Sequence, residues 1–248
     1  HKFHLFYNGW RKAPLVGEWL TSDNSEVIDW QIPNRLFDLW QPQLDLLFNN
    51  GPDLIYSPHI NYINNRQVPR SLTIHDLSFI HYPYFFNWRS RLWHQWQNIQ
   101  EQAAKAAAIV VDSAYTKNNV METLKVPPEK IHVIYPGIDP NVRKVTFLTL
   151  RPANLNFPFI LYLGTVEPRK NVDALIEAFQ ILKQQPIFND LKLIIAGKNS
   201  DIKKSRIHTN DANNDIIYWG PATPEEKIML YNLAEVFVYP SFFEGFGF

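Results

Sequence analysis

The chain of 248 residues is long enough for one large domain or two domains of ordinary size, and its 46% hydrophobic residues are enough to bury a core. Its formal net charge of +0 excludes a global field that would attract nucleic acid and favours a small or neutral partner. Cysteine is absent, which excludes disulfides and thiolate metal sites and suits a reducing, cytoplasmic compartment.

The first half of the chain alternates short runs of β-branched and aromatic residues with helical patterns, which is typical of βα units around a parallel sheet. No run reaches the roughly 18 to 20 apolar residues that a membrane helix needs. The chain enters a strand-like run directly after His1, so we expect an upstream segment to be missing. The runs predict strands near Phe3–Tyr7, Asp53–Tyr56, Ser71–Ile74, Ala108–Val111 and Ile131–Tyr135.

His75 and Asp76 follow directly on the predicted strand Ser71–Ile74. In open α/β sheets ligands bind beyond the carboxyl ends of the strands, so this polar pair is placed for a binding cleft. A loop histidine that hydrogen-bonds a backbone carbonyl is the structural alternative, and the sequence favours neither. His59 and His81 are predicted to be structural.

The stretch FFNWRSRLWHQW predicts a helix with an aromatic face. Trp88, Leu92 and Trp96 share that face, and Arg89 and Arg91 are offset from it. Such a face would suit a membrane surface or a lipid-linked acceptor. Packing within the helix's own domain is the favoured interpretation, because aromatic residues four apart on a helix usually belong to a core.

The segment 141–158 shows no clean period and contains Pro152 and Pro158. It is therefore predicted to link two domains, residues 1–140 and residues 159–248. Strands recur in the second domain at a spacing that fits βαβ repetition, so a second parallel sheet is expected. They lie near Phe159–Leu163, Leu191–Ala196, Ile216–Tyr218 and Val236–Tyr239.

A glycine, a helix start and two cations coincide in YLGTVEPRKNVDAL. Gly164 lets the backbone pass close to a ligand, and the N-terminus of the following helix directs unpaired N–H groups at the same place. Two cations, Arg169 and Lys170, are disfavoured by the helix dipole there by ~0.3 to 1 kcal/mol. They therefore favour a bound anion, such as a diphosphate, over merely solvated side chains.

Two helices of the second half have start signals. Asn171 is expected to cap the first. Thr223 and Glu226 have the spacing of a capping box for the second, with Pro224 at its first helical position. The apolar face of the first helix comprises Val172, Leu175, Ile176, Phe179 and Leu182.

The chain ends on YPSFFEGFGF, in which Glu244 lies among phenylalanines and glycines just beyond a predicted strand. This place favours a carboxylate at a ligand site over one in a tight turn. Gly245 and Gly247 expose backbone N–H groups around it.

Several phosphate and metal motifs are absent from the sequence. No G-x-G-x-x-G follows a strand, no G-x-x-x-x-G-K-[ST] occurs, and no two aspartates are two apart. Neither a dinucleotide fingerprint nor a P-loop is predicted. We expect no cofactor and no metal, with cationic side chains binding the phosphates instead.

Taken together, GTVEPRKN, IHDLSF, VDSAYTKNNV, PPEKIHVIYPGID and VYPSFFEGFGF, in this order and spacing, closely resemble glycosyltransferase family 4. The resemblance covers Phe3 to Phe248. It implies the α/β GT-B fold, with two Rossmann-like domains facing across a cleft, the first for the acceptor and the second for a nucleotide-sugar donor. It also implies retaining, metal-independent transfer of a hexose to a glycan or lipid-linked acceptor in polysaccharide or glycolipid synthesis.

The resemblance also implies roles for individual residues. Lys170 and Arg169 would hold the donor diphosphate and offset the charge on the leaving group. His75 would lie near the donor sugar's hydroxyls, and Glu244 would be the first carboxylate of an E-x7-E motif that orients them. The variant EPRKN is reminiscent of mannosyltransferase-like members, so GDP-mannose is the expected donor. The loop that contacts sugar and phosphate through its backbone would be Gly245, Phe246 and Gly247.

Two departures from the family pattern matter. Thr165 stands where many members have an arginine, so the second phosphate cation is expected to be Arg169 or to lie elsewhere. The second glutamate of the motif would fall beyond Phe248, and the glycine-rich loop of the family's N-terminal end is missing. Both domains are therefore expected to be incomplete, and this chain alone is expected to be inactive.

Two other functions stay open. A nucleotide-sugar 2-epimerase shares the architecture, and a truncated chain could bind nucleotide sugars without acting on them. For the glycosyltransferase we expect a location in the cytoplasm. A peripheral position at the inner face of the membrane stays open as a further option.

Overall fold

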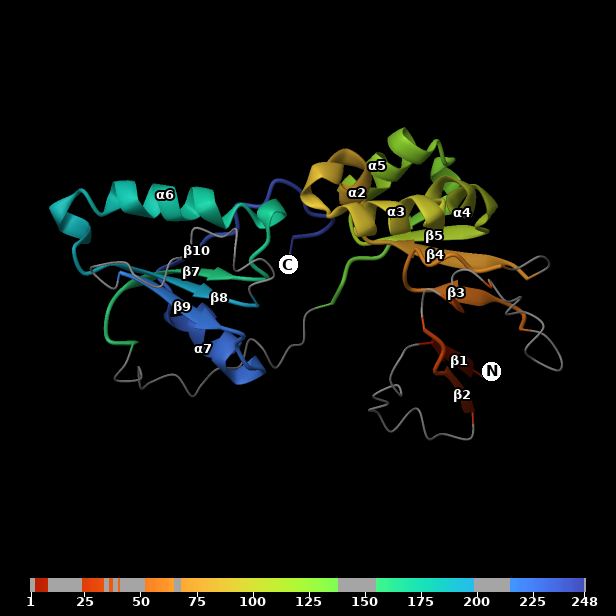
Figure 1. Ribbon diagram of the computed structural model, residues 1–248, viewed down its shortest axis with the longest axis horizontal. Coiled ribbons are helices and arrows are strands. Elements are labelled where there is room, and N and C mark those ends of the chain that lie inside the picture. Colours follow the sequence, from red (N-terminus) through yellow and green to blue (C-terminus); the bar gives the residue numbers. More distant parts are fainter. Residues whose placement is uncertain are drawn as a thin grey trace. The chain divides into compact units, whose positions relative to one another are not determined.

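The structure is a computed structural model that describes residues 3–8, 24–33, 36–37, 40, 52–64, 68–137, 155–198 and 215–247. It divides into two compact units. One is formed by His1–Leu77 and Trp88–Ile134, and the other by Ser78–Asn87 and Tyr135–Phe248. Each unit has its own parallel sheet (Figure 1).

The first unit contains a four-stranded sheet in the order β3-β4-β5-β6 and a separate pair, β1-β2, with every pairing parallel. Its helices cover one side of the larger sheet (Figure 1). The strands are β1 (Phe3–Asn8), β2 (Ser25–Trp30), β3 (Ile55–Ser57), β4 (Arg70–Ile74), β5 (Ala108–Val111) and β6 (Ile131–Val133). The helices are α3 (Trp88–Gln97), α4 (Ile99–Lys105) and α5 (Ala114–Leu124), with the 3-10 turn η4 (Pro128–Lys130).

The second unit is built on a parallel sheet in the order β10-β7-β8-β9. Its strands are β7 (Phe159–Leu163), β8 (Lys192–Ala196), β9 (Ile216–Gly220) and β10 (Val236–Phe237). Its helices are α2 (Ser78–His81), α6 (Val172–Leu182) and α7 (Pro224–Leu233), and its 3-10 turns are η3 (Pro83–Phe85), η7 (Pro168–Lys170) and η8 (Pro186–Phe188).

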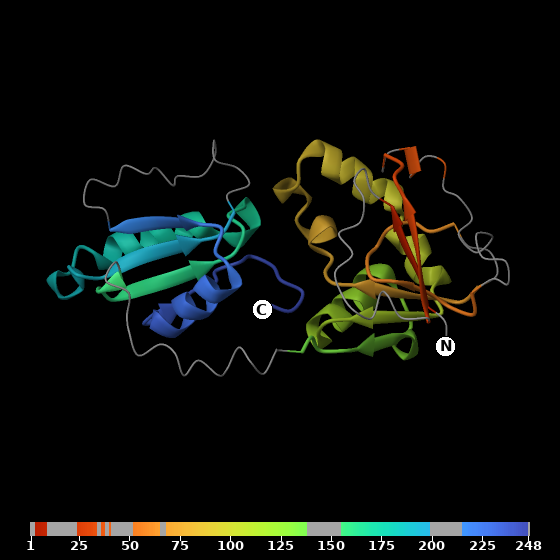
Figure 2. The same ribbon diagram turned by 90° about the horizontal axis from the view of Figure 1, so that it is seen from below.

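Both faces of the second sheet are buried, because successive side chains of a strand point to opposite faces. Ile160 and Tyr162 of β7 pack with the apolar face of α6. Phe159 and Leu161 pack on the other side with Leu230 of α7. Figures 1 and 2 show the two helices on opposite faces of the sheet. Burial on both faces explains why β7 and β8 are continuous apolar runs in the sequence.

The strands predicted in both halves of the chain are confirmed, with ends within about two residues of those observed. The sequence did not predict β2, because Glu26 and Asp29 interrupt its apolar pattern. Its parallel pairing with β1 and an edge-on contact between the rings of Trp30 and Phe6, 5.3 Å between centroids, hold it in place.

The capping box of α7 is confirmed. The Thr223 hydroxyl accepts from the Glu226 N–H at 3.2 Å, and the Glu226 carboxylate accepts from the Thr223 N–H at 2.7 Å. The cap predicted for α6 is wrong. Asn171 has φ +56°, in the left-handed region, and its side chain donates instead to the Pro240 carbonyl at 3.2 Å.

Most of the predicted linker, 141–158, lies outside the described residues, so the predicted domain boundaries stay a prediction. Leu155, near the end of that segment, is buried in the core beneath α7. Within the described part of the chain, every helix is too short or too polar to span a bilayer.

Candidate functional site

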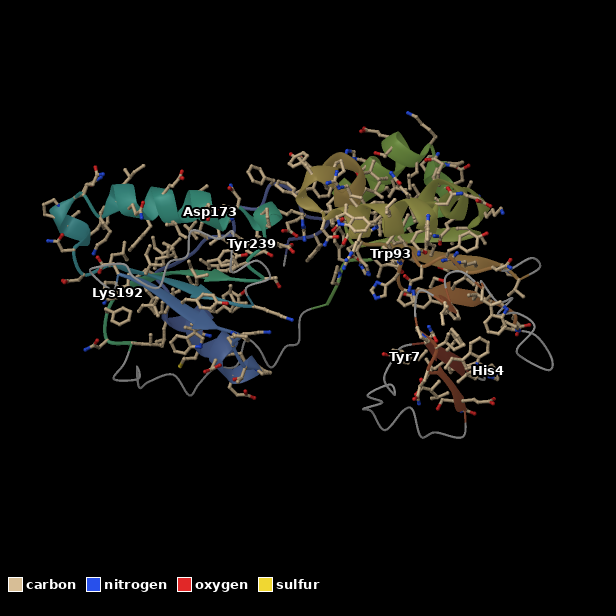
Figure 3. The ribbon with its side chains drawn as sticks, viewed as in Figure 1. His4, Tyr7, Trp93, Asp173, Lys192 and Tyr239 are labelled. Carbon is tan, nitrogen blue, oxygen red and sulfur yellow. The ribbon has the colours of Figure 1, made fainter. Side chains whose placement is uncertain are left out.

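The predicted phosphate turn lies at the carboxyl end of β7, which is the edge where parallel α/β sheets bind ligands. The strands run the same way, so Gly164 after β7, Gly197 after β8 and Tyr239 after β10 share this edge. Lys192, at the amino end of β8, and Tyr239 lie at opposite ends of the sheet (Figure 3).

Two glycines let the strand ends approach closely at this edge. The Gly164 N–H donates to the Ala196 carbonyl at 2.9 Å. Gly197 has φ +146°, and a Cβ added to it would lie 1.9 Å from the Gly164 carbonyl oxygen. No side chain fits at Gly197 unless the backbone of the turn moves. No sequence motif predicted a role for this residue, although a glycine directly after an apolar strand was an available signal.

A buried tyrosine closes the turn. The Tyr162 hydroxyl donates to the Thr165 carbonyl at 3.0 Å, and the two rings of Tyr162 and Tyr239 stack with centroids 5.7 Å apart. Burial is the main cause that raises the pKa of the Tyr162 hydroxyl well above its ordinary value. The hydroxyl therefore keeps its proton and remains a hydrogen-bond donor to the turn.

Lys170 and Glu244 form an ion pair, with the Nζ donating to the Oε1 at 2.5 Å. Lys170 is buried, with 7% of its surface exposed, and its Nζ lies 4.9 Å from the centroid of the Tyr239 ring. Arg169 Nη1 lies 3.4 Å from the other Glu244 carboxylate oxygen, and its Nη2 lies 3.0 Å from Glu167. Two cations and two carboxylates thus meet just before α6.

The turn η7 also holds the backbone of the C-terminal loop. The Arg169 carbonyl accepts from the Phe242 N–H at 3.0 Å, and Arg169 Nη1 donates to the Phe243 carbonyl at 3.0 Å. The structure thereby brings together Lys170 and Glu244, which are 74 residues apart and were both predicted as site residues. Gly245, Phe246 and Gly247 follow directly, and their contacts with sugar or phosphate stay a prediction.

The two phenylalanines before Glu244 contact the segment 78–87, which belongs to the same unit. The ring of Phe242 stacks on that of Phe85 at 5.4 Å. The buried ring of Phe243 lies 5.7 Å from His81 and 5.6 Å from Tyr82. His81 thus has a packing contact, and the structural role predicted for it stays a prediction.

His75 lies in the first unit, just beyond β4, whereas Lys170 and Glu244 belong to the second unit. Its Nδ1 is 2.6 Å from Asp112 Oδ2, and its Nε2 is 3.0 Å from the Pro58 carbonyl oxygen. The partner carboxylate is therefore Asp112 and not the adjacent Asp76. Asp112 follows β5 as His75 follows β4, which was the signal that the sequence offered. The ring of His59 lies 5.4 Å from that of His75.

The predicted packing of the aromatic face of α3 is wrong. Trp88 and Trp96 are 63% and 64% exposed, and Leu92 is also exposed. The face that turns inward lies elsewhere on the helix and consists of Ser90, Trp93, His94 and Gln97, at the spacing of one helical stripe. Arg89 lies over the Trp88 ring, 5.2 Å from its centroid. No group of three or more potential metal-ligating side chains occurs among the described residues.

Residues 1–142 match the family described as Glycosyltransferase Family 4, and residues 151–248 match the family Glycosyl transferases group 1. The first match alone spans more than half of the chain. The chain belongs to glycosyltransferase family 4. The family expected from the sequence motifs is thus confirmed.

This family 4 chain is 27% identical over 203 residues to O-antigen chain mannosyltransferase B of Escherichia coli, which covers 79% of the chain and 53% of that relative. The chain therefore spans about half the length of this relative.

Two solved structures share the fold. Anabaena Alr3699/HepE in complex with UDP-glucose has a TM-score of 0.57 at 16% identity, covering 97% of this chain and 74% of that chain. WaaG, a glycosyltransferase involved in lipopolysaccharide biosynthesis, has a TM-score of 0.59 at 15% identity, covering 90% and 64%. The predicted α/β fold of the GT-B class is thus confirmed.

Proposed function

We propose that this family 4 chain acts in a metal-independent, retaining glycosyltransferase that moves a hexose from a nucleotide-sugar donor to a glycan or lipid-linked acceptor. The main support is the cluster of Lys170, Arg169 and Glu244 at the carboxyl edge of the second sheet. These side chains stand where a diphosphate would meet the start of α6.

The proposed transfer reaction requires cations at this position. Breaking the bond between the sugar and the diphosphate leaves negative charge on the departing phosphate, and preorganised cations lower the energy of that state. Lys170 and Arg169 are largely removed from water, which strengthens their interaction with an anion. The departing phosphate takes the proton of the acceptor hydroxyl, so no side-chain base is required. Glu244 pairs with Lys170 until the diphosphate binds and then accepts hydrogen bonds from the sugar.

We further propose that mannose is the hexose and GDP-mannose the donor. The support is the similarity to an O-antigen chain mannosyltransferase along most of the chain. The complex of the Anabaena neighbour contains UDP-glucose, so the base and the sugar both need to be varied in the test.

A donor panel on the full-length protein tests this function. GDP-mannose, GDP-glucose, UDP-glucose and UDP-galactose are each incubated with and without a lipid-linked glycan acceptor, and nucleoside diphosphate release and sugar transfer are measured. With GDP-mannose we expect release of GDP that depends on the acceptor. We expect this release to persist in EDTA. Conversion of the donor sugar without an acceptor would instead identify an epimerase, and loss of transfer in EDTA would contradict metal independence.

We also propose that the exposed face of α3 contacts an anionic membrane surface that holds the acceptor. Exposed tryptophans suit the interface of a bilayer, and each arginine near an anionic surface adds about 1 kcal/mol. Trp88, Leu92 and Trp96 are exposed on one face, and Arg89 and Arg91 are exposed beside it.

Vesicle sedimentation of the full-length protein tests this contact. The double substitution Trp88→Ser and Trp96→Ser should weaken binding to phosphatidylglycerol vesicles by about tenfold or more, given the apolar area removed. Ile187→Ser is the matched control, because Ile187 is 82% exposed on η8 of the other unit. Equal binding by the double variant and the wild type would refute the proposed face.

A further inference from the structure

The ammonium group of Lys170 has a neutral partner besides its ion pair with Glu244. Its Nζ lies over the ring of Tyr239, 4.9 Å from the ring centroid, and donates to a Glu244 carboxylate oxygen at 2.5 Å. The negative face of an aromatic ring attracts a cation, and the attraction grows when water is excluded. Lys170 is buried and Tyr239 is half-buried, so this contact is largely shielded from water.

We propose that Tyr239 is a positioning residue that holds the Lys170 ammonium at the ligand edge when a donor phosphate displaces Glu244. Its effect on donor binding rests on the proposed function, whereas the contact between ring and ammonium does not. The ring carries no net charge, so it holds the cation without neutralising it. A lysine ammonium has three N–H groups. With one directed at Glu244 and one at the ring, a third remains for a phosphate oxygen.

Neighbouring rings of the sheet fix the Tyr239 ring. It stacks on Tyr162, a buried residue of β7, with centroids 5.7 Å apart and an angle of 13° between the planes. It also stacks on Phe237 of β10, with centroids 5.9 Å apart and an angle of 22°. Because β7 and β10 are paired, the sheet determines where the Tyr239 ring lies. Glu244, in contrast, comes from the loop beyond the strand.

Backbone geometry at the strand ends brings the ring next to the lysine. The Asn171 side chain donates to the Pro240 carbonyl at 3.2 Å. This bond joins the two chain segments just beyond Lys170 and Tyr239. Gly164 leaves room for the ring, because a Cβ added there would lie only 3.1 Å from a carbon of the Tyr239 ring. The glycine of the phosphate turn therefore also accommodates the ring that contacts the lysine.

NMR of the full-length protein with isotope-labelled lysine tests the contact itself. The ring current of Tyr239 should shift the ε-methylene proton resonance of Lys170 upfield, and Lys170→Met identifies that resonance. We expect the shift in the wild type and in Tyr239→Phe but not in Tyr239→Leu, and we expect it to persist with GDP or UDP bound. A wild-type resonance at the ordinary position, or loss of the shift when nucleotide binds, would overturn the inference. Failure of both nucleotides to bind would refute the proposed function and the role of Tyr239 in binding, and the free protein would still report the contact.

A double-mutant cycle on nucleotide affinity tests whether Tyr239 acts through Lys170. Tyr239→Leu should weaken binding of GDP or UDP by about 5- to 20-fold, because the ammonium loses the ring that holds it. Tyr239→Phe keeps the ring and should bind like the wild type. In a Lys170→Met background, Tyr239→Leu should cause no further loss. An equal loss in both backgrounds would show a merely structural role and overturn the assignment.

Fluorinated phenylalanines in place of Tyr239 give a second measurement that preserves the shape of the ring. Each added fluorine withdraws electrons from the face of the ring, so nucleotide affinity should fall stepwise from phenylalanine to its mono-, di- and trifluoro forms. Constant affinity along this series would contradict the proposal. Tyr231→Leu is the matched control, because the Tyr231 ring lies 5.0 Å from that of Phe237 and, among the described residues, no cation lies over it. It should leave nucleotide affinity unchanged, and a loss equal to that of Tyr239→Leu would also overturn the proposal.

Discussion

Two helices of the second unit begin near the same edge of the sheet, but the charged residues around their first turns differ. The start of α7 has a capping box and two glutamates, Glu225 and Glu226, in its first turn. The start of α6 has one carboxylate, Asp173, in its first turn and no side-chain cap, and it follows directly on Arg169 and Lys170. Carboxylates are favoured and cations disfavoured at a helix N-terminus. The charges at the start of α7 therefore stabilise that helix. The two cations at the start of α6 destabilise it, but they lie at the carboxyl edge of the sheet, where ligands bind in such folds.

Glu244 resolves the conflict at the start of α6. Lys170 is buried, and a buried charge without a partner is costly. The Glu244 carboxylate supplies the missing negative charge to both Lys170 and Arg169. It comes from a distant loop and not from the helix itself. The proposed function requires that the cations exchange this partner for a phosphate, which a capping residue fixed within the helix would not allow.

The largest effect is expected from Lys170→Ala. It removes the buried cation from the ligand edge, and we expect transfer by the full-length protein to fall by about 10³-fold or more, with the fold retained. Donor binding by calorimetry and turnover with the best donor measure the loss. Lys183→Ala is the matched control, because Lys183 also forms a half-buried ion pair, 3.1 Å from Asp215, but at the other end of α6. It should lower stability and leave donor binding unchanged; comparable transfer losses in both variants would contradict the functional assignment of Lys170.

Glu244→Gln should affect binding and transfer in opposite directions. Without its negative charge, Lys170 and Arg169 are less neutralised, so GDP or UDP alone should bind about 3- to 10-fold more tightly. Transfer should fall by about 10²-fold, because the carboxylate no longer orients the hydroxyls of the sugar.

Glu167→Gln is the comparison for this second prediction, since Glu167 pairs with Arg169 at 3.0 Å and has no ion pair with Lys170 among the described residues. It should increase nucleotide affinity less and preserve most of the transfer. If Glu244→Gln weakens nucleotide binding instead, Glu244 does not compete with the phosphate for the two cations.

The pairing of Lys170 with Glu244 was easier to anticipate from the sequence than that of His75 with Asp112, for a physical reason. Lys170 and Glu244 each lie just beyond an apolar strand in a short stretch with its own signal, and parallel pairing alone brings such stretches to one edge. The contact between His75 and Asp112 also joins two strand ends. Asp112 was missed because a single aspartate before a helix cap has an ordinary structural explanation, and Asp76 was nearer in the chain.

The error on α3 has a different origin. Apolar spacing shows that Trp88, Leu92 and Trp96 share a face, but spacing does not show which face points inward. The inward stripe includes Gln97, which is buried, and the sequence gives no reason to place a glutamine inside. Likewise, the place of Gly197 directly after an apolar strand is visible in the sequence, but its close approach to Gly164 is not, since that contact depends on the pairing of β7 with β8.

Gly197→Ala tests whether this close approach shapes the start of α6. Its Cβ would meet the Gly164 carbonyl oxygen at 1.9 Å, so the turn must shift; we expect a loss of about 3 kcal/mol in the free energy of unfolding, together with weaker donor binding. Gly220→Ala is the control, because Gly220 has φ +82° but open space around a Cβ. It should lose about 1 kcal/mol from backbone strain alone and keep its donor affinity. Equal losses in denaturant titrations of the two variants would contradict a steric role for Gly197.

Thr223→Ala should have the smallest effect, and it concerns stability alone. Losing the cap of α7 should cost about 1 kcal/mol at neutral pH, with transfer unchanged, and Thr223→Ser should restore most of it.

The effect of Thr223→Ala should also depend on pH. The Glu225 carboxyl forms hydrogen bonds with its own backbone N–H and with the Thr223 hydroxyl, and these bonds lower its pKa. A carboxyl whose pKa is depressed by folding stabilises the protein above its unfolded pKa, and this stabilisation is lost as the pH falls through the folded value. The difference between wild type and Thr223→Ala in urea titrations should therefore shrink as the solution is acidified. A difference that stays constant with pH would mean that the cap acts without the carboxylates, and the charge contrast between the two helix starts would then have no part in the stability of α7.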